Sequence, residues 1–212
     1  MLGSDLSQIE ARVMGHYLFP YDDGAFIQEL LEGDIHQSLA DSLGIDRNLA
    51  KSVRYASMYG CSGTKLAKIL GVPSKEGVRL QAEFWNSNKP LDRLRKEITM
   101  AFNKRGFIKG LDGRKLMIRS EHALLNSLLQ AAATVVFKTG LCMINNTLRW
   151  KGLWYKQLIA YHDEVQLEVR KEDADAVGKI VLSSWEQAGE RWGMRVPIVG
   201  EIKTGNSWAE TH

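Results

Sequence analysis

Four side chains that could bind a nucleotide recur at four-residue intervals in one stretch of the chain: Arg47, Lys51, Tyr55 and Tyr59. Side chains with this spacing lie along one face of a helix. The face would present cations near the helix start, where backbone N–H groups and the macrodipole also favour anions, and aromatic rings one or two turns further on. This arrangement suits a triphosphate followed by a base, although an ordinary amphipathic helix with solvated cations and half-buried tyrosines has the same pattern.

The boundaries of this helix can be predicted from the residues beside it. Asp46 is a good N-cap residue, and Gly60 can adopt the left-handed conformation that ends a helix. Upstream, Asp34 can cap a second helix that carries His36 in its first turn. A histidine at a capped helix start is more often a structural hydrogen-bond partner, and His36 becomes a candidate phosphate contact because the cationic helix follows it.

A second set of chemically active residues consists of carboxylates. Asp5 ends a predicted strand, and Asp163 and Glu164 lie at the turn of a β-hairpin predicted from the alternating pattern of residues 157–170. Strands of one antiparallel sheet can bring these groups side by side, where they would repel each other without a cation. Two Mg²⁺ ions about 3.5–4 Å apart can bridge such aspartates, activate a 3′-hydroxyl and neutralise a leaving pyrophosphate.

The composition is that of a soluble globular protein, with 212 residues, 44% hydrophobic and 25% charged. A net charge of +3 is compatible with a polyanionic partner but does not require one. The two cysteines, Cys61 and Cys142, have no metal-ligand spacing and cannot make a disulfide framework. No apolar run approaches bilayer length and the N-terminus lacks the pattern of a signal peptide, so we expect a cytoplasmic protein without a membrane partner.

The order of elements predicts an α+β fold, with a small antiparallel sheet and a mostly helical insertion. The sheet would contain the strand ending at Asp5, the 158–170 hairpin and a final strand over 196–203. A helix beginning near Ile9 should end at Pro20. The remaining expected elements are helices over 25–31, 34–42, 75–85, 90–104, 122–149 and 172–192, and a β excursion over 106–119.

Along the long helix 122–149, polar side chains repeat at four-residue spacing beside the apolar core face: His122, Asn126 and Gln130. Amide side chains can donate to base edges or accept from sugars, which suits the minor groove of a primer-template. Simple exposure to solvent is the commoner explanation of such a stripe.

Three short segments occur along the chain in the order typical of a known enzyme family. Residues 5–12 (DLSQIEAR) look like motif A, residues 47–60 fit the motif B pattern R-x3-K-x3-[FY]-x3-Y-G, and residues 162–164 (HDE) look like motif C. In this order they resemble the C-terminal catalytic part of family A DNA polymerases, the DNA polymerase I group, and look closest to its phage replicative branch. The resemblance implies template-directed DNA synthesis from dNTPs by a two-metal mechanism.

The resemblance implies a role for each matching residue. Asp5 and Asp163 would hold two Mg²⁺ ions, with Glu164 assisting nearby. The phosphates of the incoming nucleotide would be contacted by His36, Arg47 and Lys51. Tyr55 would pack against the sugar and base, and Glu10 would close the space that a ribose 2′-hydroxyl needs, which argues for DNA rather than RNA synthesis.

Other matching residues would bind the DNA primer-template. Tyr59 and Gly60 would lie beside the templating base, and His162 would lie near the primer end. Further residues match primer-template positions of the family: Gln8, His122, Asn126 and Gln130.

Two residues depart from the family pattern without removing a catalytic group. Leu6 replaces the usual aromatic residue, and Ala56 replaces a common glycine.

The resemblance divides the chain into palm residues 1–21 carrying motif A, fingers residues 22–118 carrying motif B, and palm residues 119–212 carrying motif C. The thumb, the first part of the palm and any 3′–5′ exonuclease domain would be absent. We therefore expect the catalytic piece of a split polymerase, in which a separate protein chain supplies the thumb and N-terminal palm. Its location would be a bacterial host cytoplasm if a phage encodes it.

Three alternatives stay open. The chain could be a minimal autonomous polymerase of low processivity, because all three motifs are intact. It could also be a non-catalytic nucleotide- or DNA-binding remnant, or a truncated fragment that is inactive without the thumb and N-terminal palm. A single-subunit RNA polymerase is disfavoured by Glu10 and by the acid that follows Asp163.

Overall fold

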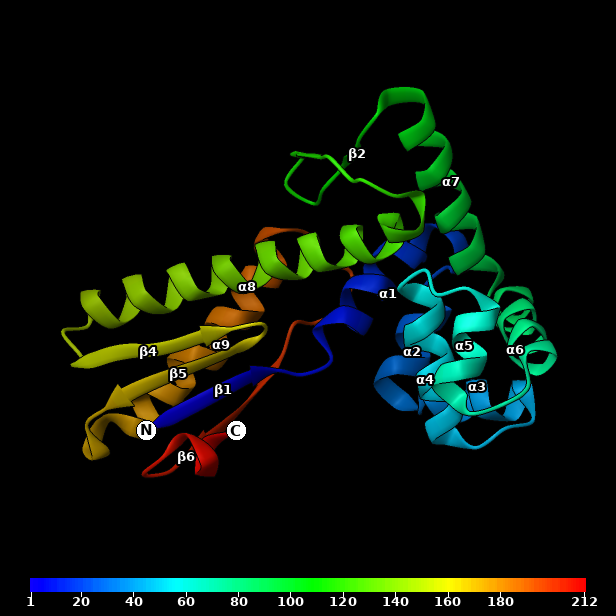
Figure 1. Ribbon diagram of the computed structural model, residues 1–212. Coiled ribbons are helices and arrows are strands. Elements are labelled where there is room, and N and C mark those ends of the chain that lie inside the picture. The colour runs from blue at the N-terminus through cyan, green and yellow to red at the C-terminus, as the bar shows by residue number, and fades with distance from the viewer. The chain divides into compact units, whose positions relative to one another are not determined.

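The structure is a computed structural model that describes the whole chain, Met1–His212 (Figure 1). The residues form two compact units. The first unit contains Met1–His16 and Gln130–His212, and the second contains Tyr17–Leu129. Helices α1 (Ile9–Asp22) and α8 (Leu124–Trp150) contribute residues to both units.

The first unit is built on a four-stranded antiparallel sheet with strand order β4-β5-β1-β6. The strands are β1 (Leu2–Leu6), β4 (Tyr155–Tyr161), β5 (Glu164–Val169) and β6 (Gly200–Thr204). Since β1 lies between two strands, its end is held on both sides, and Asp5 pairs with Glu164 on β5 and Glu201 on β6. The β4–β5 hairpin turns at His162 and Asp163.

Helix α9 (Ala174–Arg191) packs on β1 and β6, and its Trp185 is completely buried. The Trp185 ring stacks on Phe137 of α8 at a centroid distance of 5.5 Å and donates to Ser4 Oγ at 2.9 Å. Gly140 makes room for this ring, because a Cβ there would overlap the indole. These contacts fix β1 against the helices. The unit also contains the 3-10 turn η2 (Lys171–Asp173) and the helix α10 (Trp208–Thr211).

The second unit is mainly helical. It contains α2 (Ala25–Glu32), α3 (Ile35–Leu43), α4 (Arg47–Met58), α5 (Gly63–Leu70), α6 (Ser74–Ser87), α7 (Lys89–Arg105), the short strands β2 (Ile108–Lys109) and β3 (Lys115–Leu116), and the 3-10 turn η1 (Glu121–Ala123). Helix α4 contacts α3, α5 and α6, so only part of its circumference remains available to solvent. Its buried side includes Ala50, Val53 and Met58.

The α+β fold expected from the sequence is confirmed, including the strand at Asp5, the hairpin and the capped helices. Asp34 and Asp46 accept backbone hydrogen bonds at the starts of α3 and α4. Gly60 has a φ of 73°, in the left-handed region expected where the helix ends. The two units divide the chain within α1 and α8, whereas the predicted domains meet at 21/22 and 118/119.

The end of the first helix was predicted wrongly. Helix α1 continues through Pro20 to Asp22 instead of ending at Pro20. Proline removes one hydrogen-bond donor and crowds the carbonyl four residues earlier. In the last turn of a helix this disturbance is confined to its end, and Asp23 N still donates to Phe19 O at 3.0 Å.

The start of the last strand also differs from the prediction, because β6 begins at Gly200 and not at Val196. The preceding backbone bonds to other groups. Val199 O accepts from Ser7 N at 3.0 Å, and Pro197 O accepts from Arg12 Nη1 at 2.6 Å. Val196 and Ile198 are buried, which explains why their apolar alternation resembles a strand.

One helix, spanning Glu121–Trp150, is long and apolar enough to cross a membrane, which differs from the expectation that no apolar run approaches bilayer length. Half of the most apolar 18-residue segment of this helix is buried inside the structure. The core helix of a soluble protein has the same length and composition, so this feature is weak support for a membrane span.

Gly60 is required by its surroundings as well as by its backbone conformation. A Cβ at this position would overlap the carbonyl oxygen of His122. We expect Gly60→Ala to lower the free energy of unfolding by about 2–3 kcal/mol, because the clash adds to the cost of a left-handed alanine. Urea denaturation measures this loss.

Gly44→Ala is the matched control, since Gly44 has a φ of 64° and no atom lies within 4 Å of the place that an added methyl group would take. This variant should lower the free energy of unfolding by about 1 kcal/mol, the cost of placing alanine in the left-handed conformation. Equal losses of unfolding free energy in the two variants would show that the close approach of Gly60 to His122 does not add to the cost of the substitution.

Candidate active site

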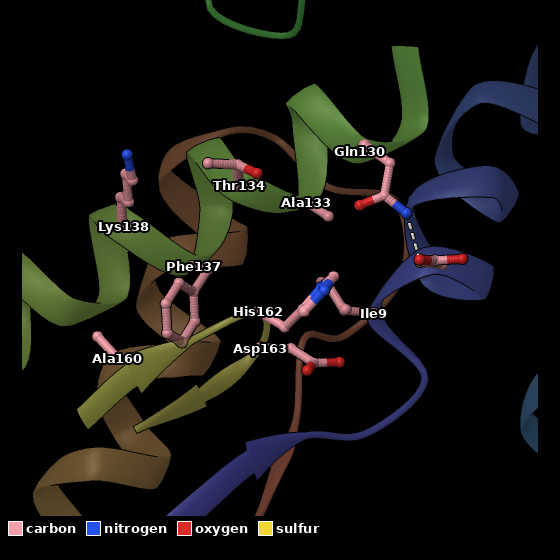
Figure 2. Close-up of a pocket in the computed structure, with 10 residues that line it drawn as sticks. Ile9, Gln130, Ala133, Thr134, Phe137, Lys138, Ala160, His162 and Asp163 are labelled. Carbon is pink, nitrogen blue, oxygen red and sulfur yellow. Dashed lines mark hydrogen bonds between the residues drawn. The ribbon is translucent and has the colours of Figure 1, made fainter. Parts of the chain in front are cut away.

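The carboxylates predicted to hold metal come together at the end of β1. Asp5 lies directly opposite Glu164 in the β1–β5 register, and Leu6 N donates to Asp163 O at 3.0 Å. Asp163 occupies the hairpin turn, where His162 has a φ of 55°, and Figure 2 shows both side chains at the tip of the hairpin. The antiparallel register thus joins acidic residues from opposite ends of the sequence.

The negative charges in this group act on one another. The pKa of Asp5 is raised to about 6, first by burial and then by the charges of Asp163 and Glu164. Glu201 contributes in the same direction, while the nearby charge of His212 opposes it. The end of β1 therefore carries an excess of negative potential, which a cation would relieve.

The donor set fits magnesium that is held jointly with a substrate. No group of three or more His, Cys, Asp or Glu side chains is arranged to bind a metal by itself. Mg²⁺ is commonly bound by one or two carboxylates together with substrate phosphates and water. Asp5 and Asp163 supply carboxylates of this kind at adjacent strand ends.

A pocket of about 310 Å³ lies beside Asp163 in the same unit, between residues of α1, α8 and the hairpin (Figure 2). Ile9 and Glu10 line it from α1, and His162 lines it from the hairpin. The Gln130 amide donates to the Glu10 carboxylate, as the dashed line in Figure 2 shows. Gln130, which the sequence suggests for minor-groove contact, is therefore engaged with Glu10 in this structure.

The second unit presents the predicted nucleotide-binding residues on α3 and α4. Arg47 and Lys51 are exposed near the start of α4. The Tyr55 ring centroid lies 5.9 Å from that of His36 and 6.2 Å from that of Tyr59, so the rings form a row. The helix face therefore carries cations first and aromatic rings further on, as the spacing predicts.

His36 lies in the first turn of α3 and is half-buried. Burial lowers the pKa of its imidazole, and the positive charges of Arg54 and Arg47 lower it further. The ring is thus biased toward its neutral form, so we expect it to act near neutral pH as a hydrogen-bonding group and not as a cation.

The residues predicted to bind the primer-template are distributed over both units. In the second unit, Gly60 packs against the backbone of His122, which is exposed in η1, and Asn126 is half-buried on α8. In the first unit, Gln8 is exposed between β1 and α1 with a φ of 52°. Each unit therefore holds part of the predicted site.

The sequence is similar to known polymerases over nearly its whole length. The family model described as DNA polymerase family A matches residues 1–210. This chain belongs to DNA polymerase family A. The expected family is thereby confirmed, and the match includes the segments that carry Asp5, Arg47 and Asp163.

Relatives within family A are longer than this chain. The DNA-directed DNA polymerase of Enterobacteria phage T3 is 32% identical over 99% of this chain and 33% of the phage protein. DNA polymerase I of Pseudomonas aeruginosa is 29% identical over 100% of this chain and 25% of its own length. The chain therefore spans a third or less of these curated relatives.

Among solved structures, the POL domain of Pol1 from M. smegmatis in complex with DNA primer-template and dNTP has the same fold. Its TM-score is 0.86, and the match covers 99% of this chain and 40% of that chain at 22% sequence identity. The comparison establishes the architecture of this family A chain.

Glu164 of this family A chain is held by residues that sequence reasoning missed. Its carboxylate accepts from Gln166 Nε2 at 2.5 Å and Trp208 Nε1 at 2.7 Å, and His212 Nδ1 lies 2.9 Å from its second oxygen. Thr211 Oγ1 donates to Gln166 Oε1 at 2.8 Å. Burial raises the pKa of Glu164, but the hydrogen bonds outweigh it and leave the pKa below its ordinary value.

Part of this network has a signal in the sequence. Glu164 and Gln166 are two residues apart on a strand, so their side chains lie on the same face of the sheet. An amide two residues from a buried acid is a natural hydrogen-bond partner. The C-terminal partners Trp208 and His212 have no comparable local signal, because they reach Glu164 only through the tertiary fold.

Trp208→Phe should lower the free energy of unfolding by about 1–2 kcal/mol, since it removes one hydrogen bond to a buried carboxylate and keeps an aromatic ring. Trp154→Phe is the control, because Trp154 is also partly exposed. Its ring face contacts the Lys156 ammonium group, a contact that a phenylalanine ring can keep. The control should change stability by less than about 0.5 kcal/mol. Denaturant unfolding of the two variants compares them, and similar losses would contradict the assigned role of Trp208.

Proposed function

We propose that this chain is the catalytic piece of a DNA polymerase that transfers a deoxynucleotidyl group from a dNTP to a primer 3′-hydroxyl, as a template directs. The observation that carries the proposal is the meeting of Asp5 and Asp163 at adjacent strand ends, in the register that also buries Glu164. Membership in family A and the fold shared with a polymerase domain support the proposal.

Asp5 and Asp163 would hold two Mg²⁺ ions. When bound, the ions would supply Lewis acidity at the attacking hydroxyl and stabilise the charge of the leaving pyrophosphate. The contribution of the protein is to hold both carboxylates on elements fixed by the sheet register. Glu164 stays ionised beside them because its hydrogen bonds lower its pKa.

The triphosphate would bind along the exposed face of α4. Arg47 and Lys51 supply positive charge there, and His36 supplies a hydrogen-bonding ring beside it. Tyr55 offers a ring face for the sugar and base, next to Tyr59. This order of groups matches the order of phosphate, sugar and base in a nucleotide.

Glu10 would restrict the site to deoxyribonucleotides. Its hydrogen bond with Gln130 gives it a defined place in the lining of the pocket beside Asp163. A ribose 2′-hydroxyl would have to enter the space that this pair fills. Ready incorporation of ribonucleotides would instead favour the RNA polymerase alternative.

A separate chain carrying the thumb and N-terminal palm would complete the enzyme by docking against the sheet of the first unit. Strand β4 is an edge of the sheet, and it exposes Leu158 and Tyr161, 49% and 63% accessible. An edge strand with exposed apolar side chains is a favourable docking surface. The completed enzyme would act in the cytoplasm, that of a bacterial host if a phage encodes it.

Asp163→Asn tests the proposed chemistry. The variant keeps the size of the side chain but removes a charge that metal binding requires, so primer extension should fall by at least about a hundredfold. Binding of dNTP should change by less than about twofold, because the α4 cations are unaltered. The assay is extension of a recessed primer-template with Mg²⁺ and dNTPs by the purified chain, with parallel dNTP titrations.

Glu168→Gln is the control, since Glu168 is an exposed acid on the same strand β5. It should extend primers as the wild type does. Extension by the wild type and the control alone would establish an autonomous minimal polymerase. Binding of dNTP and primer-template without extension would favour a split enzyme or a non-catalytic remnant, and normal extension by Asp163→Asn would contradict the proposed chemistry.

A further inference from the structure

Asp34 uses both of its carboxylate oxygens at the junction of α3 and α4. One oxygen, Oδ1, accepts from His36 N at 2.9 Å and from Gln37 N at 3.1 Å, which caps the start of α3. The other, Oδ2, accepts from Arg47 Nε at 2.7 Å. One side chain therefore fixes the backbone of His36 and the head group of Arg47 at the same time.

The way in which Arg47 is held leaves it able to bind a ligand. Only Nε of the guanidinium contacts Asp34, and its terminal nitrogens donate to no protein group. The guanidinium is planar and rigid, so a bond at Nε fixes the direction of the terminal N–H groups. Those groups are the pair suited to bidentate recognition of phosphate oxygens. The Arg47 side chain is 45% accessible, so a ligand can reach it.

A buried arginine on α4 also holds the start of α3 in place. Arg54 is only 4% accessible, and its Nη2 donates to Ile35 O at 2.6 Å, between Asp34 and His36 in the chain. Its Nε and Nη1 have no hydrogen-bond partner, although both are buried. Burying an arginine with unpaired donors costs free energy, and the hydrogen bond to Ile35 O offsets part of this cost.

We propose that Asp34 is a positioning residue for the incoming nucleotide, which orients the Arg47 guanidinium toward the triphosphate and holds His36 beside it. The inference rests on the proposed function, because it takes the exposed face of α4 as the phosphate-binding surface. Asp34 touches neither substrate nor metal in this role and acts through Arg47.

The direction in which triphosphate affinity changes when Asp34 is lost distinguishes a positioning role from a purely electrostatic one. A carboxylate next to a phosphate-binding cation reduces the positive potential, so by charge alone the loss of Asp34 should tighten triphosphate binding. If Asp34 instead orients Arg47, its loss should weaken binding, because a mobile guanidinium must be ordered when the ligand arrives. The observed bond at Nε, with both terminal nitrogens free, favours the second outcome.

The test is isothermal titration calorimetry of the whole 212-residue chain with inorganic tripolyphosphate and with dATP, each with Mg²⁺ present. Asp34→Asn and Asp34→Ser both retain a good N-cap residue for α3 and remove the carboxylate partner of Arg47. Each should weaken binding of both ligands about fivefold. Asp41→Asn is the matched control, since Asp41 is an exposed acid on α3 that bonds only to Gln37, and it should change binding by less than about twofold.

A double-mutant cycle with Arg47→Ala shows whether Asp34 acts through Arg47. In the Arg47→Ala background, Asp34→Asn should have no further effect. Tighter binding by Asp34→Asn, an unchanged affinity, or an equal loss in the Arg47→Ala background would each overturn the inference while leaving the proposed function intact. If neither ligand binds the wild type, the proposed phosphate-binding surface is wrong and the inference fails with it.

Discussion

The first unit depends on holding like charges together at one end of a sheet. Asp5, Asp163 and Glu164 approach each other because β1 pairs with β5 in a single register, and the unit must offset their repulsion. The stacked rings of Trp185 and Phe137 fix the sheet, and hydrogen bonds from the C-terminal segment satisfy Glu164. The charge at Asp5 is left without such compensation, and its pKa rises to about 6. Binding of a divalent cation at the proposed site would relieve this repulsion.

The second unit meets the opposite electrostatic requirement. Helix α4 displays Arg47 and Lys51 on an exposed face, and α3 adds His36 next to the aromatic row. Two arginine contacts hold the start of α3 to α4, one through the Asp34 side chain and one through a backbone carbonyl. The first unit therefore carries a group of acidic side chains at the end of β1, and the second unit carries exposed cations on α4.

Sequence reasoning succeeded where the physical cause was local. The capping of α3 and α4 by Asp34 and Asp46, the helical row on α4 and the hairpin turn all follow from spacing and residue type. It failed where tertiary contacts decide the outcome, as in the continuation of α1 through Pro20 and the start of β6. The partners of Glu164 on α10 and at the C-terminus were missed for the same reason. No periodicity links positions more than about forty residues apart, and only the sheet register and the packing of α10 bring them together.

Mn²⁺ binding, measured by the loss of the free-ion electron paramagnetic resonance signal, tests most directly whether Asp5 and Asp163 form one cation site. We expect the wild-type chain to bind Mn²⁺, and Asp5→Asn and Asp163→Asn should each weaken binding by about tenfold or more. Glu201→Gln, which alters the acid opposite Asp5 on β6, should weaken it by less than about threefold. Equal losses in all variants would show a diffuse acidic surface and not a defined site. Unchanged binding in Asp5→Asn and Asp163→Asn would contradict a cation site formed by these two residues.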